Sequence, residues 1–161
     1  MIIKKIENCE LNYTQVKYLD YVNNYIDKIG LDDSFNVGST EEGRWDDKNN
    51  GIPYVESIIK GSTIMPIVIV DLIKCQEKTI EDSVDYQYFQ SWIDKGFEYL
   101  AVDGNNRTIT IRKFFRDNLI GLRPNTKYEV TTDSGRIVPF EITNENNTYD
   151  TLPSALKDKL A

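Results

Sequence analysis

Two short runs of apolar, mostly β-branched residues constrain the fold of this chain most. The first covers Ile64–Ile73 and is nearly continuous, which is typical of a strand with both faces covered. The second covers Phe97–Val102 and runs directly into Asp103-Gly104. With a shorter strand expected over 2–6, these segments predict a small sheet at the centre of the chain.

Apolar residues at helical spacing predict helices around this sheet. We expect helices over 14–29, 53–60 and 86–95, each followed by a glycine that suits a helix end: Gly30, Gly61 and Gly96. Between the first two helices, residues 32–51 are polar and predict a long loop, a kind of segment that tends to be functional or mobile.

The second half of the chain contains one conflict between signals. Thr108–Ile111 favours a strand by its β-branched residues, whereas Ile111, Phe114 and Leu119 follow helical spacing. We predict a helix from about Thr108, because tertiary context often overrides propensity. Strands over 128–131 and 136–142 form an expected hairpin, and a last helix begins near Leu152-Pro153. The expected fold class is α+β, a small mixed sheet flanked by helices, in a single domain over residues 1–161.

Composition excludes several classes of function. The formal net charge of −7 argues against a protein that grips nucleic acid over its whole surface. The chain has no histidine, which excludes Ser-His-Asp and Cys-His catalysis and histidine-ligated metal sites. Its two cysteines are far apart and are expected to be inert thiols. No apolar run is long enough to span a bilayer, and the start lacks a signal-peptide core, so we expect a cytoplasmic protein without a membrane partner.

The segment Asp103-Gly104-Asn105-Asn106-Arg107 is the strongest candidate for a site. Glycine lets the backbone turn sharply, and a helix start offers unpaired N–H groups to an anion. Arg107 can grip phosphate with two donors, and Asp103 can hold a metal ion or orient a water. We expect the amides of 104–108 and the Arg107 side chain to face an open cleft. The alternative is a plain strand-to-helix turn with a surface arginine.

Neighbouring charges add two further expectations. The basic residues Arg112, Lys113 and Arg116 predict a local positive patch in an acidic protein. Asp46-Asp47 would be able to join Asp103 around a divalent ion, although carboxylates in loops more often act as caps or are solvated. We assign no metal ligand from this pattern.

Three motifs in order resemble the ParB N-terminal/sulfiredoxin-like superfamily, in particular its GmrSD-type restriction branch. They are Ser57-Ile58-Ile59-Lys60-Gly61, Ile64-Met65-Pro66-Ile67 and Val102-Asp103-Gly104-Asn105-Asn106-Arg107. The branch has a Ser-Ile-x-x-Gly helix end, an Ile-Pro-Pro-Ile strand entry and Asp-Gly-Gln-Gln-Arg before a helix. The resemblance covers about residues 40–120, with an echo in Leu152-Pro153.

The resemblance implies a module that binds a nucleoside triphosphate, and possible hydrolysis with Mg²⁺, in a restriction or phage-related DNA-processing protein. By it, Asp103 and Arg107 occupy candidate catalytic positions. The phosphate-binding candidates are Gly104, Asn105, Asn106, Arg107 and Thr108. Relatives also have an upstream Arg and Trp at the pocket, but Arg44 and Trp45 are adjacent here, so only one of them can be in register.

Two departures from the family limit the expected activity. Sulfiredoxin uses a cysteine inside its motif, and Asn105 and Asn106 supply no nucleophile. GmrSD-type proteins carry a histidine-based nuclease domain that this chain lacks, so we expect a lone module, or the N-terminal part of a longer protein that meets DNA through a separate domain. The alternatives are a non-catalytic DNA- or protein-interaction module that retains the fold and, third, a ParB-like specific DNA binder.

Overall fold

The fold is α+β, as predicted, and its centre is a five-stranded mixed sheet with the order β2-β1-β4-β5-β3. The structure, a computed structural model, describes residues 2–7, 10–32, 34, 45–62 and 65–160. β1 pairs antiparallel with β2 and parallel with β4, while β5 pairs antiparallel with β4 and parallel with β3. The strands are β1 (Ile2–Glu7), β2 (Glu10–Gln15), β3 (Ile29–Leu31), β4 (Ile67–Asp71) and β5 (Tyr99–Asp103).

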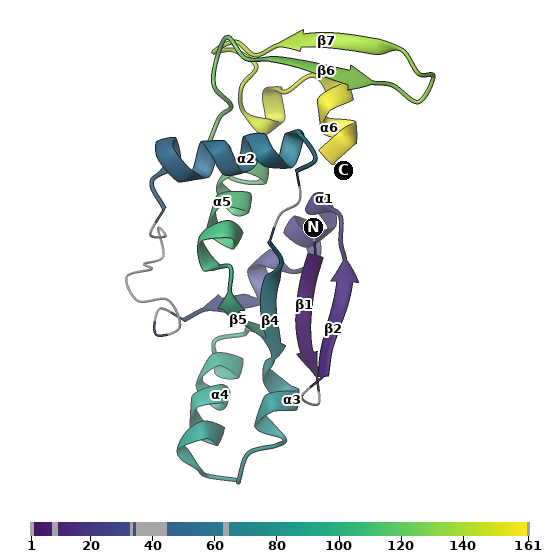
Figure 1. The fold of residues 1–161 in the computed structure, drawn as a ribbon. Helices are drawn as coiled ribbons and strands as arrows, with labels where there is room; N and C mark the ends of the chain where they lie inside the picture. The colour runs from purple at the N-terminus through teal and green to yellow at the C-terminus, as the bar shows by residue number, and fades with distance from the viewer. Residues whose placement is uncertain (1, 8–9, 33, 35–44, 63–64, 161) are drawn as a thin grey trace.

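Helices surround this sheet at both ends and on one face. They are α1 (Tyr18–Asn24), α2 (Ile52–Ile59), α3 (Leu72–Gln76), α4 (Val84–Asp94), α5 (Asn105–Phe115) and α6 (Ser154–Leu160). Figure 1 shows α3 and α4 at one end of the sheet. At the other end lie α2, α6 and a hairpin of β6 (Lys127–Thr131) and β7 (Ile137–Glu141). None of the helices described is long and apolar enough to cross a membrane.

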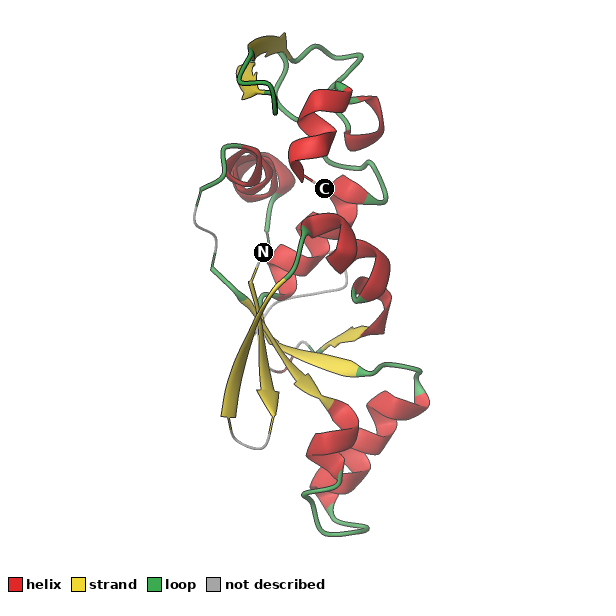
Figure 2. Ribbon diagram, turned by 90° about the vertical axis from the view of Figure 1, so that its right-hand side faces the viewer, coloured by secondary structure: helices red, strands yellow, loops and turns green. Residues whose placement is uncertain are grey.

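The hydrophobic core lies between the sheet, α1, α2 and α5. Fully buried side chains from four elements meet there: Tyr21, Val55, Ile67, Ile69, Ile111 and Phe114. Figure 2 shows the twisted sheet between an upper group of helices and a lower pair. Because most residues of α5 are buried, the start of that helix is fixed on a rigid support.

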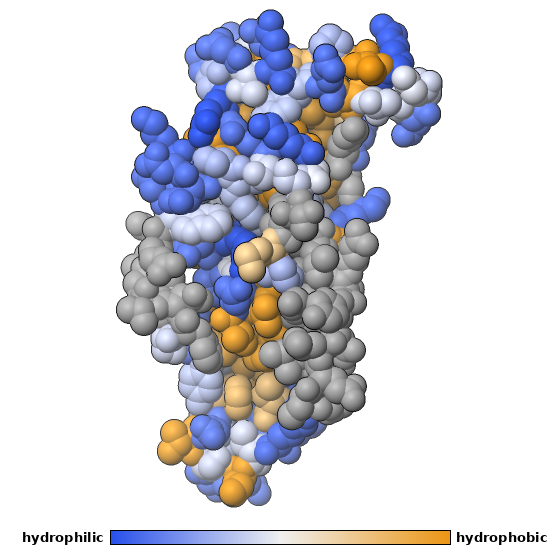
Figure 3. All heavy atoms as spheres, in the orientation of Figure 1, coloured by the Kyte–Doolittle hydropathy of each residue, from blue (hydrophilic) through white to orange (hydrophobic). Residues whose placement is uncertain are grey.

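β4 is covered more completely on one face than on the other, which corrects the prediction that both of its faces are buried. Ile67 and Ile69 have no exposed surface, whereas Val68 and Val70 are half-buried. Figure 3 shows an apolar surface over the region of β4. β-branched residues suit a half-buried pleated surface as well as a buried one, so the continuous run did not distinguish the two cases.

The helix predicted over 14–29 is divided among four elements. Thr14 and Gln15 end β2, α1 covers Tyr18–Asn24, a 3-10 turn (η1) covers Ile26–Lys28, and Ile29 begins β3. The apolar spacing continues because residues of the separate elements are buried in the same core. Gly30, predicted to end the helix, lies in β3, where a Cβ atom would be 2.7 Å from Trp92 Cε3.

Other predicted elements are confirmed with shifted ends. The helices expected over 53–60 and 86–95 are α2 and α4, the hairpin is β6–β7, and the last helix is α6. Gly61 and Gly96 follow their helices with φ angles of 70° and 89°. The run predicted as one strand over 64–73 ends earlier, because Asp71 caps α3 by accepting a hydrogen bond from the Lys74 N–H at 3.1 Å.

Candidate functional site

A single residue, Gly104, connects β5 to α5. Its φ of 99° lies in the left-handed region that favours glycine. A Cβ atom on Gly104 would be 3.0 Å from Ile67 Cγ1 and 3.2 Å from Ile67 Cα. The glycine is therefore required twice, for the sharp turn and for the close approach of β4.

The helix begins earlier than predicted, at Asn105 instead of about Thr108. The residues Asn105, Asn106 and Arg107 thus form its first turn. The Thr108 N–H donates to the Gly104 carbonyl at 2.8 Å, so the N–H groups of the three preceding residues have no acceptor within the helix. This turn contains no acidic side chain, and its cap residue has no side chain at all. Its partial positive charge is of the kind that favours an anion.

Arg107 is fixed by Asp103, four residues earlier in the chain. Its Nη2 lies 2.8 Å from Asp103 Oδ2, and the Arg107 side chain is 11% exposed while that of Asp103 is 54% exposed. The two candidate catalytic residues therefore contact each other. The pair orients the guanidinium and partly compensates its charge, while other N–H donors of the arginine are not used by Asp103.

Tyr54, in the first turn of α2, lies close enough to Arg107 for their charges to interact. Burial raises the pKa of the Tyr54 hydroxyl well above its usual range, Tyr18 adds to the shift, and the charge of Arg107 opposes it. The hydroxyl is buried and has no hydrogen-bond partner among the described residues. Tyr54 is not among the residues predicted for the site, because a tyrosine after Pro53 at a helix start carries no signal in the sequence for a site.

The two asparagines of the motif make different contacts. Asn105 is 2% exposed, its Nδ2 donates to the Asp32 carbonyl at 3.4 Å, and its Oδ1 is buried without a partner in the described part of the chain. Asn106 Oδ1 accepts from the Trp45 N–H at 3.3 Å. The Trp45 ring packs edge-on against Tyr54, with centroids 5.4 Å apart. Trp45 therefore lies beside the motif, whereas Arg44 lies outside the described residues.

Thr108, the last of the predicted phosphate-binding residues, forms a hydrogen bond with a core tyrosine, Tyr21. Its Oγ1 lies 2.9 Å from the hydroxyl of Tyr21, which has no exposed surface. Burial raises the pKa of Tyr21 well above its usual range, and the hydrogen bond with Thr108 partly offsets the shift. This bond joins α5 to α1, so the Thr108 side chain positions the helix.

The predicted positive patch on α5 is wrong, because each of its basic residues is paired with a carboxylate. Lys113 Nζ lies 3.0 Å from Asp47 Oδ1, and Arg112 Nε lies 3.6 Å from Asp117 Oδ2. Arg116 pairs with Asp27 and Asp117. These pairs neutralise the charge that the sequence suggested was available to a ligand.

The carboxylates considered for a metal ion have other contacts. Asp46 caps a π-helical turn, Asp47–Gly51 (η3), by accepting from the Asn49 N–H at 2.8 Å. Asp47 pairs with Lys113, and Asp103 with Arg107. No group of three or more potential metal ligands is found among the residues that the structure describes.

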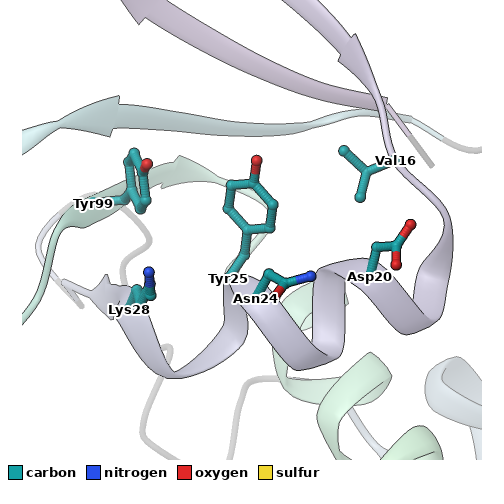
Figure 4. Close-up of a pocket in the computed structure, with 6 residues that line it drawn as sticks. All are labelled: Val16, Asp20, Asn24, Tyr25, Lys28 and Tyr99. Atoms are coloured by element: carbon teal, nitrogen blue, oxygen red, sulfur yellow. The ribbon is translucent and has the colours of Figure 1, made fainter.

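Two cavities formed by described residues lie away from the motif. One, of about 440 Å³, lies beside α1, η1 and the beginning of β5 (Figure 4), where Tyr25 and Tyr99 stand side by side. The other, of about 340 Å³, lies between α2, β6 and α6. Residues 104–108 are buried and line neither cavity. Neither of these two cavities is the open cleft expected at the motif.

Comparison of the chain with family models, curated proteins and solved structures finds no match.

Proposed function

We propose that the chain binds the phosphate groups of a nucleoside triphosphate at the first turn of α5. The observation that carries the proposal is that the start of α5 has no side-chain cap and that Arg107 lies in the same turn. The Arg107 guanidinium is oriented by Asp103, with 2.8 Å between Nη2 and Oδ2. Helix-start N–H groups and a guanidinium are both groups that bind phosphate.

The position of each residue suggests its role in binding phosphate or in hydrolysis. The N–H groups after Gly104 donate hydrogen bonds to phosphate oxygens, and Arg107 donates through the N–H groups that Asp103 does not use. Asp103 is the more exposed member of the pair, so its carboxylate is the group suited to orient a water or to hold Mg²⁺ for hydrolysis. The resemblance to GmrSD-type proteins supports placing such a module in a restriction or phage-related DNA-processing protein.

A second candidate function is a non-catalytic DNA- or protein-interaction module. The observation in its favour is that Arg107 already has a carboxylate partner, Asp103, and that the arginine is mostly buried. An arginine of this kind can stabilise a strand-to-helix turn without any ligand. The two candidates differ in what Arg107 does, so they can be separated by measurement.

The test is calorimetric titration with each of the four nucleoside triphosphates, with and without magnesium. Under the proposal, Arg107→Ala weakens binding by about 1.5–3 kcal/mol, or about ten- to a hundredfold, because a charge-assisted contact is lost. Arg107→Lys recovers only part of this loss, since an ammonium lacks the planar fork. Asp103→Asn should lower hydrolysis more than binding.

Arg112→Ala is the matched control, because it removes an arginine from the same helix that is paired with Asp117 beyond the first turn. It should leave nucleotide affinity unchanged. Because Arg107 is buried, thermal melts of Arg107→Ala are expected to show some destabilisation, and affinity is compared at temperatures where each variant is folded. If the parent protein binds none of the four nucleotides, the interaction module takes the place of this proposal.

A further inference from the structure

The groove of about 340 Å³ beside β6 has a mixed lining, and its aliphatic residues come from three elements. Ile59 comes from α2, Val130 from β6, and Leu156 and Leu160 from α6. Four consecutive residues of β6, 127–130, line the groove, so it follows the edge of the strand. Its volume is at the lower end of the range found for ligand pockets.

The hydrogen bonds of the hairpin indicate which backbone groups of β6 face away from β7. In the antiparallel register, Glu129 lies opposite Pro139, which has no N–H to exchange, so this pair is not hydrogen-bonded. In agreement, the Ile142 N–H donates to the Thr126 carbonyl, and the Thr132 N–H donates to the Arg136 carbonyl, both at 2.9 Å. Even-numbered residues of β6 therefore bond to β7.

The N–H and C=O groups of the odd-numbered residues Lys127, Glu129 and Thr131 consequently point to the other edge of β6. β6 pairs with no strand other than β7 among those described. Lys127 and Glu129 also line the groove. The free edge of the strand thus borders the groove.

The two edges of the hairpin differ in their ability to accept another strand. Pro139 lies on β7, and by the same register its missing N–H belongs to the outer edge of β7. Proline on an edge strand is one way in which proteins prevent strand addition. β6 has no proline, so its edge is the one that remains competent for pairing.

The positive charge of two lysines at the groove favours an acidic partner. Lys60 and Lys127 line it, and neither forms an ion pair with a described residue, although the chain carries a net charge of −7. Glu129 is the one carboxylate among the described lining residues. The buried hydroxyl of Tyr128, another lining residue, has no partner among the described residues.

We propose that an extended segment of another protein, with alternating apolar and acidic residues, adds to β6 as a third strand of the small sheet. Its backbone bonds to the outward groups of Lys127 and Glu129, its apolar side chains enter the groove, and its carboxylates meet Lys60 and Lys127. This is the strand-addition mode of peptide recognition. The surface is formed by residues other than those of the proposed phosphate site, so either proposal can fail without the other.

The test is fluorescence polarisation of the full chain with a labelled short peptide in which Val and Glu alternate. We expect saturable binding, and a loss of at least about tenfold when alternate backbone amides of the peptide are N-methylated, because several strand hydrogen bonds are removed together. Replacing Glu by Lys in the peptide should also weaken binding. A methylated peptide that binds as tightly as its parent, or an alternating peptide that does not bind, overturns the proposal.

Protein variants locate the site. Lys60→Glu with Lys127→Glu should reduce binding about tenfold or more, whereas the control Lys17→Glu with Lys78→Glu, which changes the net charge equally at distant exposed positions, should not. Glu129→Pro removes an outward N–H without removing a ladder bond and should also weaken binding, as long as melts show that it is folded. Calorimetric binding of dodecanoate, without any binding of the peptide, would assign the groove to a small amphipathic anion and overturn strand addition.

Discussion

Replacing Gly104 by alanine tests the geometry on which the phosphate site depends. An alanine at φ 99° incurs about 1–2 kcal/mol of backbone strain. The new Cβ would also lie 3.0 Å from Ile67 Cγ1 and 3.2 Å from Ile67 Cα, and a backbone atom in β4 cannot rotate away. Crowding of this kind adds about 1–3 kcal/mol. We therefore expect Gly104→Ala to lower the free energy of unfolding by about 2–5 kcal/mol.

Gly96→Ala is a control that has the backbone strain without the crowding, so the difference between the two variants measures the crowding. Gly96 has a similar φ of 89°, but nothing lies within 4 Å of the position of its Cβ. Gly96→Ala should therefore lower the free energy of unfolding by only about 1–2 kcal/mol, the cost of the strain. The measurement is urea unfolding followed by circular dichroism, with midpoint and slope compared among the parent and both variants. If the two variants lose equal stability, β4 does not pack against the turn as described, and the reasoning about Gly104 is refuted.

Three further predictions concern β3, the hairpin and the excluded activities. Gly30→Ala should lower the free energy of unfolding by about 1–3 kcal/mol, because its Cβ would contact Trp92 Cε3 at 2.7 Å, and Trp92→Leu should relieve part of the loss in denaturant melts. Burial, with a smaller effect from Glu56, raises the pKa of Tyr128 to about 12, so the parent should lose stability as the pH rises from about 10 towards that value. Tyr128→Phe should reduce this loss and cost little at neutral pH, since its hydroxyl lacks a described partner; a large loss would reveal a bond to it. The purified chain should show neither DNA cleavage nor sulfiredoxin activity in gel and peroxiredoxin-reduction assays, and cleavage abolished by a point change within the chain would contradict this.

Local signals in the sequence were sufficient for much of the fold. The β-branched runs, the glycines after α2 and α4, and the turn at Asp133-Ser134-Gly135 indicate elements without knowledge of the rest of the chain. The helix predicted over 14–29 was too long because burial alone does not identify an element. Val16, Ile26 and Ile29 are all buried, yet they belong to separate segments that share one core.

The environment of the site was much less accessible to sequence reasoning. The turn at Gly104 follows from the order strand, glycine, helix. The pairing of Lys113 with Asp47 and of Arg116 with Asp27 does not, because the partners are 66 and 89 residues apart. The positions of Tyr54 and Tyr21 near the motif depend likewise on packing between distant elements. Charge along one helix therefore gave a wrong picture of the charge available to a ligand.

The strand order has a consequence for how the chain reaches this structure. β1 must pair with β4, and β3 with β5, across long intervening segments, so the central sheet cannot close until β5 has been synthesised. Such non-local pairing slows folding, because loop closure is unfavourable before the contacts form. During translation, the β1–β2 hairpin would be exposed, with the edge of β1 unpaired, until β4 is available. We expect a nascent chain that has not yet emerged as far as β5 to be the species most prone to aggregation and most dependent on chaperones.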